Sequence, residues 1–253
     1  MLIVNADDFG YSPAVNAAIV RAFRDGLISS TTIMANGQAF DEACELAHRH
    51  GFAGRIGCHL VLTEGEPVTE EVKRFSRFCD AQGMFRFKRN RHPVFWPNEV
   101  RALRIEIAEQ LNRCRERGLA ITHVDGHHHC HAEPAVFHVL APVLRSLKVP
   151  YLRLTDNVRP ARLARRLYKR FFNATVRWAG FAGTDYFCDF QDLPRLDRVL
   201  RRDTAIVEVM VHPAISPDGA LIDAESQLPL AGPLEIALQS SRLGSYADIG
   251  RVA

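Results

Sequence analysis

Apolar runs typical of buried strands alternate along this chain with segments of helical periodicity. The first run covers 2–6, and a helix is expected after it because Ser12 suits an N-cap, Pro13 suits the first helical position and Gly26 can end the helix. Further strands are expected in 30–35, 55–62, 120–124, 151–154 and 205–211, and helices in 40–50, 98–117, 161–178, 233–243 and directly after Glu133-Pro134. This alternation predicts an α/β fold with a parallel sheet covered by helices.

Length and composition favour one large globular domain over 1–253. The chain has 253 residues, with 47% hydrophobic and 24% charged residues, and α/β barrels commonly have this size. Segment 64–97 interrupts the alternation with scattered proline, glycine and phenylalanine, so we expect an irregular excursion that forms a lid or substrate wall. A net charge of +3 is too small to indicate a nucleic-acid partner.

The cysteines and the N-terminus indicate a cytoplasmic protein. The six cysteines form no C-x-x-C pair and no dense framework, which favours free thiols and a reducing compartment. The apolar run 1–4 meets Asn5 and Asp7 at once, leaving no room for a signal peptide. No stretch approaches about 18 consecutive apolar residues, so no membrane span is expected.

Carboxylates and imidazoles gather where the predicted strands end. Asp7 and Asp8 follow the first strand, His59 lies in the third, the cluster 125–131 follows the fourth, and His212 follows the last. The carboxyl ends of parallel strands meet at one edge of a sheet, so these groups are expected to converge. One carboxylate and two imidazoles suit a catalytic divalent cation. The alternatives are helix capping by the aspartates and a structural, buried His59.

Four histidines in the cluster 125–131 are hard to explain as a surface accident. His127, His129 and His131 alternate, so they would share one side of an extended segment, with His128 turned away. This pattern favours His127 over His128 as a metal ligand, although both stay open as candidates. His212, just before Pro213, is a candidate general acid.

Four motifs together resemble a known family. They are Asn5-Ala6-Asp7-Asp8-Phe9-Gly10, Gly57-Cys58-His59-Leu60 with Glu64-Gly65 and Pro67 behind it, Asp125-x-His127-x-His129-x-His131, and Val211-His212-Pro213. They are similar to the YdjC-like carbohydrate deacetylases, which include chitooligosaccharide and hopanoid-biosynthesis deacetylases. The resemblance covers nearly the whole chain, and it implies a distorted, incomplete (β/α) barrel, similar to a TIM barrel. One departure is Gly126, where the family often has serine.

The resemblance also implies roles for individual residues. Asp8, His59 and His127 would hold one divalent metal ion, with zinc expected first and magnesium, manganese or cobalt left open. Asp7 would take a proton from the attacking water, and His212 would protonate the departing amine. Arg153 would orient Asp7 or bind substrate, and His129 is a further expected substrate contact. The implied reaction removes an acetyl group from an N-acetylated sugar, which would be the protein's partner. A metal-dependent phosphoesterase and a non-catalytic sugar-binding protein are the alternatives.

Two other features bear on partners. The aromatic residues around Trp96 suit a sugar platform, because flat rings stack on pyranose faces, or alternatively a small core beneath a loop. The segment Arg162–Arg170 carries five basic residues along a predicted helix, which is typical of a solvated face or of a peripheral contact with anionic lipid. The sequence leaves open the oligomeric state, homo-oligomers included.

Overall fold

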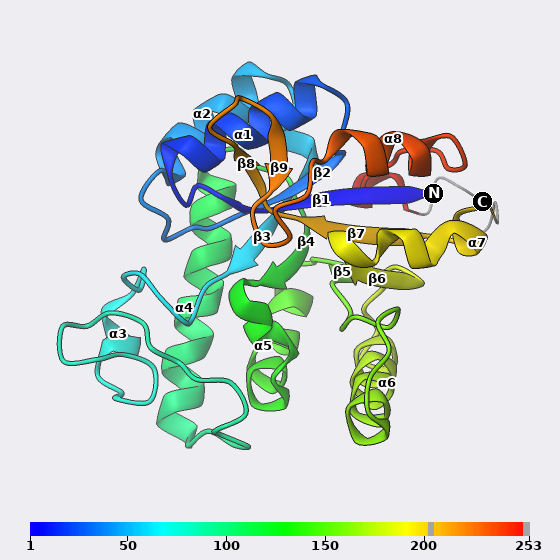
Figure 1. Cartoon of the computed structure of the whole chain (residues 1–253). Helices are drawn as coiled ribbons and strands as arrows, with labels where there is room; N and C mark the ends of the chain where they lie inside the picture. Colours follow the sequence, from blue (N-terminus) through cyan, green and yellow to red (C-terminus); the bar gives the residue numbers. More distant parts are fainter. Residues whose placement is uncertain (202–204, 250–253) are drawn as a thin grey trace.

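A computed structural model describes residues 1–201 and 205–249, and Figure 1 shows helices arranged around one curved sheet. The strands of this sheet are β1 (Leu2–Phe9), β2 (Ser30–Ile33), β3 (Ile56–Leu60), β4 (Ile121–Gly126), β5 (Tyr151–Leu152), β6 (Tyr186–Asp189) and β7 (Val207–Val211). The α-helices are α1 (Pro13–Arg24), α2 (Phe40–Arg49), α3 (Glu70–Lys73), α4 (Pro97–Glu116), α5 (Pro134–Ser146), α6 (Leu163–Trp178), α7 (Asp197–Leu200) and α8 (Ala231–Leu238). A small antiparallel hairpin pairs β8 (Pro213–Ile215) with β9 (Leu221–Asp223).

The seven strands pair in parallel in the order β5-β4-β3-β2-β1-β7-β6. The sheet curls into a half-barrel, and β5 and β6 form its two edges. The predicted α/β fold with an incomplete barrel is therefore confirmed. Because β1 lies inside the sheet, between β2 and β7, the first and last predicted strands bring their carboxyl ends together.

Burial explains why the first strand and helix form where the sequence predicts them. Leu2, Ile3 and Val4 of β1 are fully buried, as expected for an interior strand of a parallel sheet covered on both faces. Ser12 caps α1 by accepting a hydrogen bond from the backbone N–H of Val15 at 3.3 Å. Gly26 has φ +71°, so a residue without a side chain ends this helical segment.

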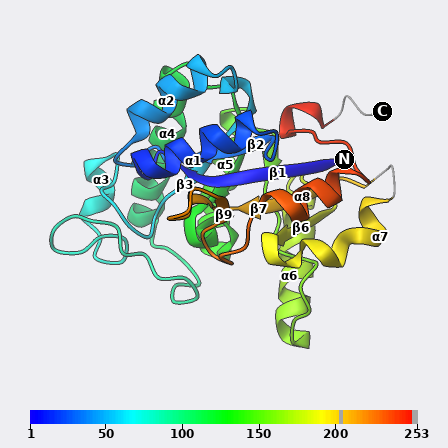
Figure 2. The same ribbon diagram turned by 45° about the horizontal axis from the view of Figure 1, so that its top comes forward.

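Three elements differ from the expectations. β6 was not predicted, because it has only four residues and is defined by its pairing with β7. The β8–β9 hairpin was also missed; it packs against α1 (Figure 2). The prediction of an extended segment for the histidine cluster is wrong, since His127–Ala132 form a 3-10 helix.

The segment 64–97 is irregular apart from α3. Phe78, Phe85 and Phe87 are buried and belong to the main hydrophobic core, which ties this segment to α4 and to the body of the protein. The six cysteines are free and buried. Within residues 1–201 and 205–249, no helix is long and apolar enough to cross a bilayer.

Candidate metal centre and active-site cleft

A bulge at the end of β1 turns both aspartates toward one cleft. Between the pairs Ala6↔Thr31 and Phe9↔Ile33 the register with β2 shifts, so β1 carries one extra residue there. Asp8 takes a left-handed conformation with φ +68°. Adjacent residues of a regular strand face opposite sides of the sheet, but Asp7 and Asp8 both line the cleft. Its volume is about 480 Å³.

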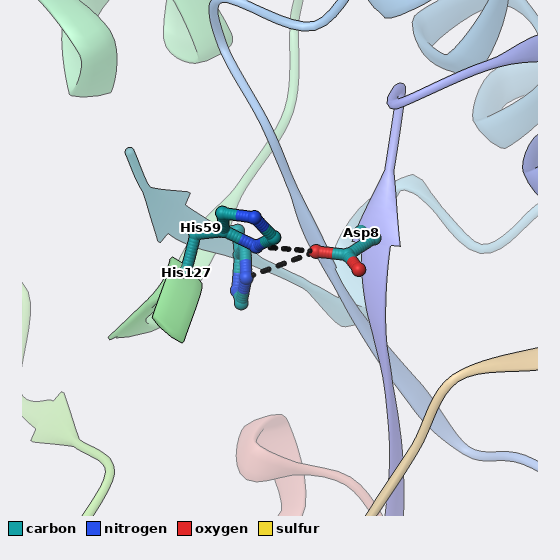
Figure 3. A group of neighbouring side chains, drawn as sticks. All are labelled: Asp8, His59 and His127. Carbon is teal, nitrogen blue, oxygen red and sulfur yellow. Dashed lines mark hydrogen bonds and ion pairs between the residues drawn. The ribbon is translucent and has the colours of Figure 1, made fainter. Parts of the chain in front are cut away.

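Asp8, His59 and His127 converge, as Figure 3 shows, from β1, β3 and the start of the 3-10 helix. Asp8 Oδ1 lies 3.1 Å from His59 Nε2 and 3.0 Å from His127 Nδ1. With metal–ligand bonds of about 2.0–2.1 Å, tetrahedral ligands stand about 3.3 Å apart. The three donor groups lie within 4.8 Å of one another, so their chemistry and spacing fit a divalent cation.

Asp125 fixes the orientation of His59 from behind. His59 Nδ1 lies 2.7 Å from Asp125 Oδ1, while the hydroxyl of Thr32 donates to Asp125 Oδ2 at 3.0 Å. This contact directs Nε2 of His59 toward Asp8, an arrangement that often orients metal-binding histidines. All three residues are buried. The sequence analysis included Asp125 in the histidine cluster but assigned it no role.

Arg153 is fully buried and holds Asp7 through two hydrogen bonds. Its Nη1 donates to Asp7 Oδ2 at 2.6 Å, and its Nη2 donates to Asp7 Oδ1 at 2.7 Å. The same guanidinium pairs with Asp125 at 2.7 Å and with Glu208 at 2.8 Å. Of the two roles expected for Arg153, the orientation of Asp7 matches these contacts, since the side chain does not line the cleft.

A second set of possible metal-binding groups lies nearby, but an arginine occupies it. It consists of Asp7, His59 and Asp125. Its ligand atoms also lie within 4.8 Å of one another. However, the Arg153 guanidinium already binds both carboxylates, so a cation here would compete with a buried positive charge. We therefore assign the candidate metal centre to the set that contains Asp8.

The acidic surroundings favour positive charge in the candidate metal centre. Burial lowers the pKa of His59, but the charge of Asp125 and hydrogen bonds with Asp125 and Asp8 outweigh it, and the net pKa lies well above its usual range. Burial raises the pKa of Asp8, yet hydrogen bonds with His127 and His59 hold it well below its usual range. Burial acts likewise on Asp7, where Arg153 outweighs it and keeps the carboxylate ionised by lowering its pKa.

His127 reaches the site because the backbone turns directly after it, which the alternation of histidines did not predict. His128 and His129 both adopt left-handed conformations, with φ 50° and 54°. Gly126 allows this turn, because a Cβ there would lie 2.9 Å from Cys130 Sγ. His128 is exposed, with its Nδ1 2.9 Å from the Thr63 hydroxyl.

Of the two candidate ligands, His127 therefore lies with Asp8 and His59, and its Nε2 stands 2.7 Å from Glu64 Oε1. The sequence analysis assigned Glu64 no role. His129 lines the cleft beside His127, which keeps its expected substrate contact as a prediction.

His212 reaches the cleft from the end of β7. Its backbone N–H donates to Asp223 Oδ1 at 2.7 Å, which ties it to the hairpin. Its ring Nδ1 lies 3.9 Å from Asp223 and 3.8 Å from Glu225, and the side chain is 17% exposed. Trp96, by contrast, is 68% exposed at the start of α4 and does not line the cleft, so its role as a sugar platform stays a prediction.

Comparison with known proteins places this arrangement in a family. The family model described as "YdjC-like protein" matches residues 1–243, and the chain belongs to this family. A carbohydrate deacetylase of Brevibacillus brevis is 36% identical over 87% of this chain and 84% of its own length. A carbohydrate deacetylase of Vibrio vulnificus is 34% identical over 95% and 88%. A chitooligosaccharide deacetylase of Salmonella paratyphi B is 30% identical over 99% and 95%.

Solved structures support the same fold. A protein of Enterococcus faecalis named for cellobiose-phosphate cleavage superposes with a TM-score of 0.75 at 22% identity, covering 98% of both chains. A lactam utilization protein of Thermus thermophilus reaches 0.52 at 17% identity, covering 97% of this chain and 99% of the other. At these identities the similarity concerns the fold alone.

Proposed function

We propose that this protein is a metal-dependent deacetylase that removes the acetyl group from an N-acetylated sugar. The observation that carries the proposal is the convergence of Asp8, His59 and His127 beside an ionised Asp7 in one open cleft. Relatives of similar length are named carbohydrate deacetylase or chitooligosaccharide deacetylase, which supports amide hydrolysis on a sugar.

Asp8, His59 and His127 would hold the cation, with zinc first among the candidates because a carboxylate and two imidazoles suit it well. When bound, a divalent cation polarises the acetamide carbonyl and activates water for attack. Other residues of the chain orient the proposed ligand His59 and the proposed base Asp7. Asp125 holds the ring of His59, and Arg153 holds Asp7 at the cleft wall.

Asp7 would act as the base. Burial raises its pKa, but Arg153 outweighs burial and holds the pKa below the usual range, so the carboxylate is ionised and can accept a proton from water. Asn5 also donates to Asp7 Oδ1, at 2.8 Å, and helps to fix the direction of this carboxylate.

His212 would protonate the nitrogen that leaves as the amine. Amide hydrolysis needs such an acid because an amine anion is a very poor leaving group. His212 lies at the same cleft as Asp7, and Asp223 and Glu225 lie on one side of its ring. Base and acid thus come from neighbouring strands, β1 and β7.

A phosphoesterase with several metal ions has less support. Such an enzyme needs a second group of free ligands near the first. The available second group, Asp7 and Asp125 with His59, is already bound by Arg153. A non-catalytic sugar-binding protein would not need an ionised carboxylate beside the metal centre.

The test is an acetate-release assay over N-acetylglucosamine, its oligomers and lipid-linked N-acetylated amino sugars. We expect acetate release that disappears on metal removal and returns with added cation. Asp7→Asn and His212→Ala should each lower kcat by about 100-fold or more while metal content stays at wild-type level. Glu208→Gln is the matched control, because it changes an Arg153 partner that does not line the cleft. Phosphate release from sugar phosphates without acetate release would refute the proposal.

A further inference from the structure

Positive charge is concentrated in one segment of an otherwise acidic chain. Residues 157–184 contain seven basic residues and no aspartate or glutamate. The whole chain has a net charge of only +3, so the remaining residues carry a net charge of −4. Most of this segment is α6, which projects from the sheet in both ribbon views (Figures 1 and 2).

The same helix leaves an apolar stripe open to solvent. Leu163, Leu167, Phe171 and Trp178 are 61%, 54%, 74% and 90% exposed. At 100° per residue they fall within one narrow sector of the helix. The opposite side is packed, since Phe172 and Val176 are buried. α6 therefore has two apolar faces, of which one stabilises the fold and the other has no cover within the described residues.

Arginines flank this stripe without acidic partners. Arg166, Arg170 and Arg177 lie along one border of the exposed sector by helix geometry. Among residues 1–201 and 205–249 none of these three forms an ion pair with a carboxylate. The ion pair on α6 belongs instead to Lys169, which binds Asp156 at 2.8 Å. Arg177 donates to the Thr184 carbonyl at 3.1 Å, so Arg166 and Arg170 are the cations beside the stripe that are most available to an external anion.

We propose that α6 docks the protein on an anionic membrane surface, with the apolar stripe entering the headgroup boundary and the flanking arginines contacting lipid phosphates and carboxylates. An apolar sector bordered by cations, with an exposed tryptophan near one end, is typical of helices that lie in the membrane interface. Long arginine stems cover apolar surface while their charged ends reach the headgroups. A second copy of this chain fits poorly, because it would bring seven more cations to the same face.

Docking through the stripe would leave the opposite side of α6 free. Arg165, Tyr168 and Lys169 of α6 line a cavity of about 220 Å³, and His129 lines both this cavity and the active-site cleft. These three residues of α6 lie on the side of the helix opposite the stripe, so docking would leave the cleft open to the substrate of the proposed deacetylase function. The docking itself does not depend on that function.

The test is flotation of the full chain with vesicles of phosphatidylcholine alone or mixed with phosphatidylserine. We expect binding to the mixed vesicles at low salt, less at high salt, and little to phosphatidylcholine alone. Each arginine near an anionic bilayer contributes about fivefold to partitioning, so Arg166→Gln with Arg170→Gln should weaken it about 25-fold. Phe171→Glu should abolish it. These exposed positions should leave the melting temperature and acetate release from a water-soluble substrate unchanged.

Matched controls lie on other helices. Arg101→Gln with Arg104→Gln removes two exposed arginines from α4, and Ile236→Glu changes a 65% exposed side chain on α8. Both should bind vesicles as the wild type does. The proposal is overturned if the wild type stays unbound at low salt, if the α4 control weakens binding equally, or if light scattering finds a dimer that Phe171→Glu dissociates and no vesicle binding. Loss of acetate release with retained flotation would refute only the proposed reaction.

Discussion

Replacing Asp125 by asparagine should weaken metal binding although all three proposed ligands remain. Asp125 is fully buried, and its Oδ1 lies 2.7 Å from His59 Nδ1. Asparagine has nearly the same shape, and its carbonyl oxygen can still accept a hydrogen bond from His59. What is lost is the negative charge that orients the imidazole and increases its basicity toward a cation.

The expected magnitude follows from the kind of hydrogen bond. A buried hydrogen bond to a charged group contributes about 1.5–3 kcal/mol, and a neutral one about 1 kcal/mol. The difference of about 0.5–2 kcal/mol corresponds to a dissociation constant raised about 2- to 30-fold. Loss of a partner that orients a metal-binding histidine typically costs about 10- to 100-fold, which overlaps this range.

The assay is calorimetric titration of Co²⁺ or Zn²⁺ into metal-stripped protein. Glu208→Gln is the matched control: Glu208 is equally buried and accepts from the same Arg153 at 2.8 Å, but it does not contact His59. Asp125→Asn should bind the cation more weakly than Glu208→Gln, and Glu208→Gln should match the wild type. Equal affinities in Asp125→Asn and wild type, with both proteins folded by circular dichroism, would refute the positioning role.

Three further predictions concern the cleft and its surroundings. His127→Ala should lose bound metal by elemental analysis, whereas His128→Ala should keep it; the reverse result would shift the ligand by one residue. Asp8→Gly should be more stable than Asp8→Ala by about 1–2 kcal/mol in metal-free denaturant unfolding, because φ +68° is strained for alanine but open to glycine; equal stabilities would contradict the bulge geometry. Trp96→Ala should raise KM for acetate release without changing the melting temperature, since the ring is 68% exposed; a lower melting temperature would instead indicate a core role.

The sequence predicted most strands and the location of the site for one physical reason. Runs such as 2–6 and 55–62 are apolar because both faces of a parallel sheet are covered, and polar residues at their carboxyl ends then stand out. Asp7, Asp8 and His59 were found in this way, and they line the cleft together. The single basic helix and the long α4 were also recognisable, because 3.6-residue periodicity is local.

The parts that were missed depend on contacts between distant segments. Histidines at alternate positions predicted an extended chain, but Gly126 packs against Cys130 Sγ and the backbone turns left-handed at His128 and His129. The glycine before the histidines was the available local signal for a close approach. β6 gave no signal of that kind, since it exists through pairing with β7.

Register explains why the role of Asp125 was not accessible from the sequence. His59 and Asp125 are direct partners across β3 and β4, although 66 positions separate them along the chain. A slip of one residue would turn Asp125 to the other face of the sheet and leave His59 Nδ1 without this carboxylate. Strand pairing therefore decides which of several acidic residues becomes the partner, and no periodicity in a single strand carries that information.

The balance of buried charge gives a physical reason for a cation at this edge of the sheet. Asp7, Asp125 and Glu208 surround one guanidinium, that of Arg153, so negative charge is in excess even before Asp8 is counted. Burial raises the pKa of Glu208 and Arg153 lowers it, and the net pKa stays above its usual range, which shows the cost of burying this charge. Asp8 lies beyond the reach of Arg153 and has imidazoles for neighbours. The same acidic groups raise the pKa of His59, and a divalent cation bound to Asp8, His59 and His127 would supply the positive charge that this edge of the sheet favours.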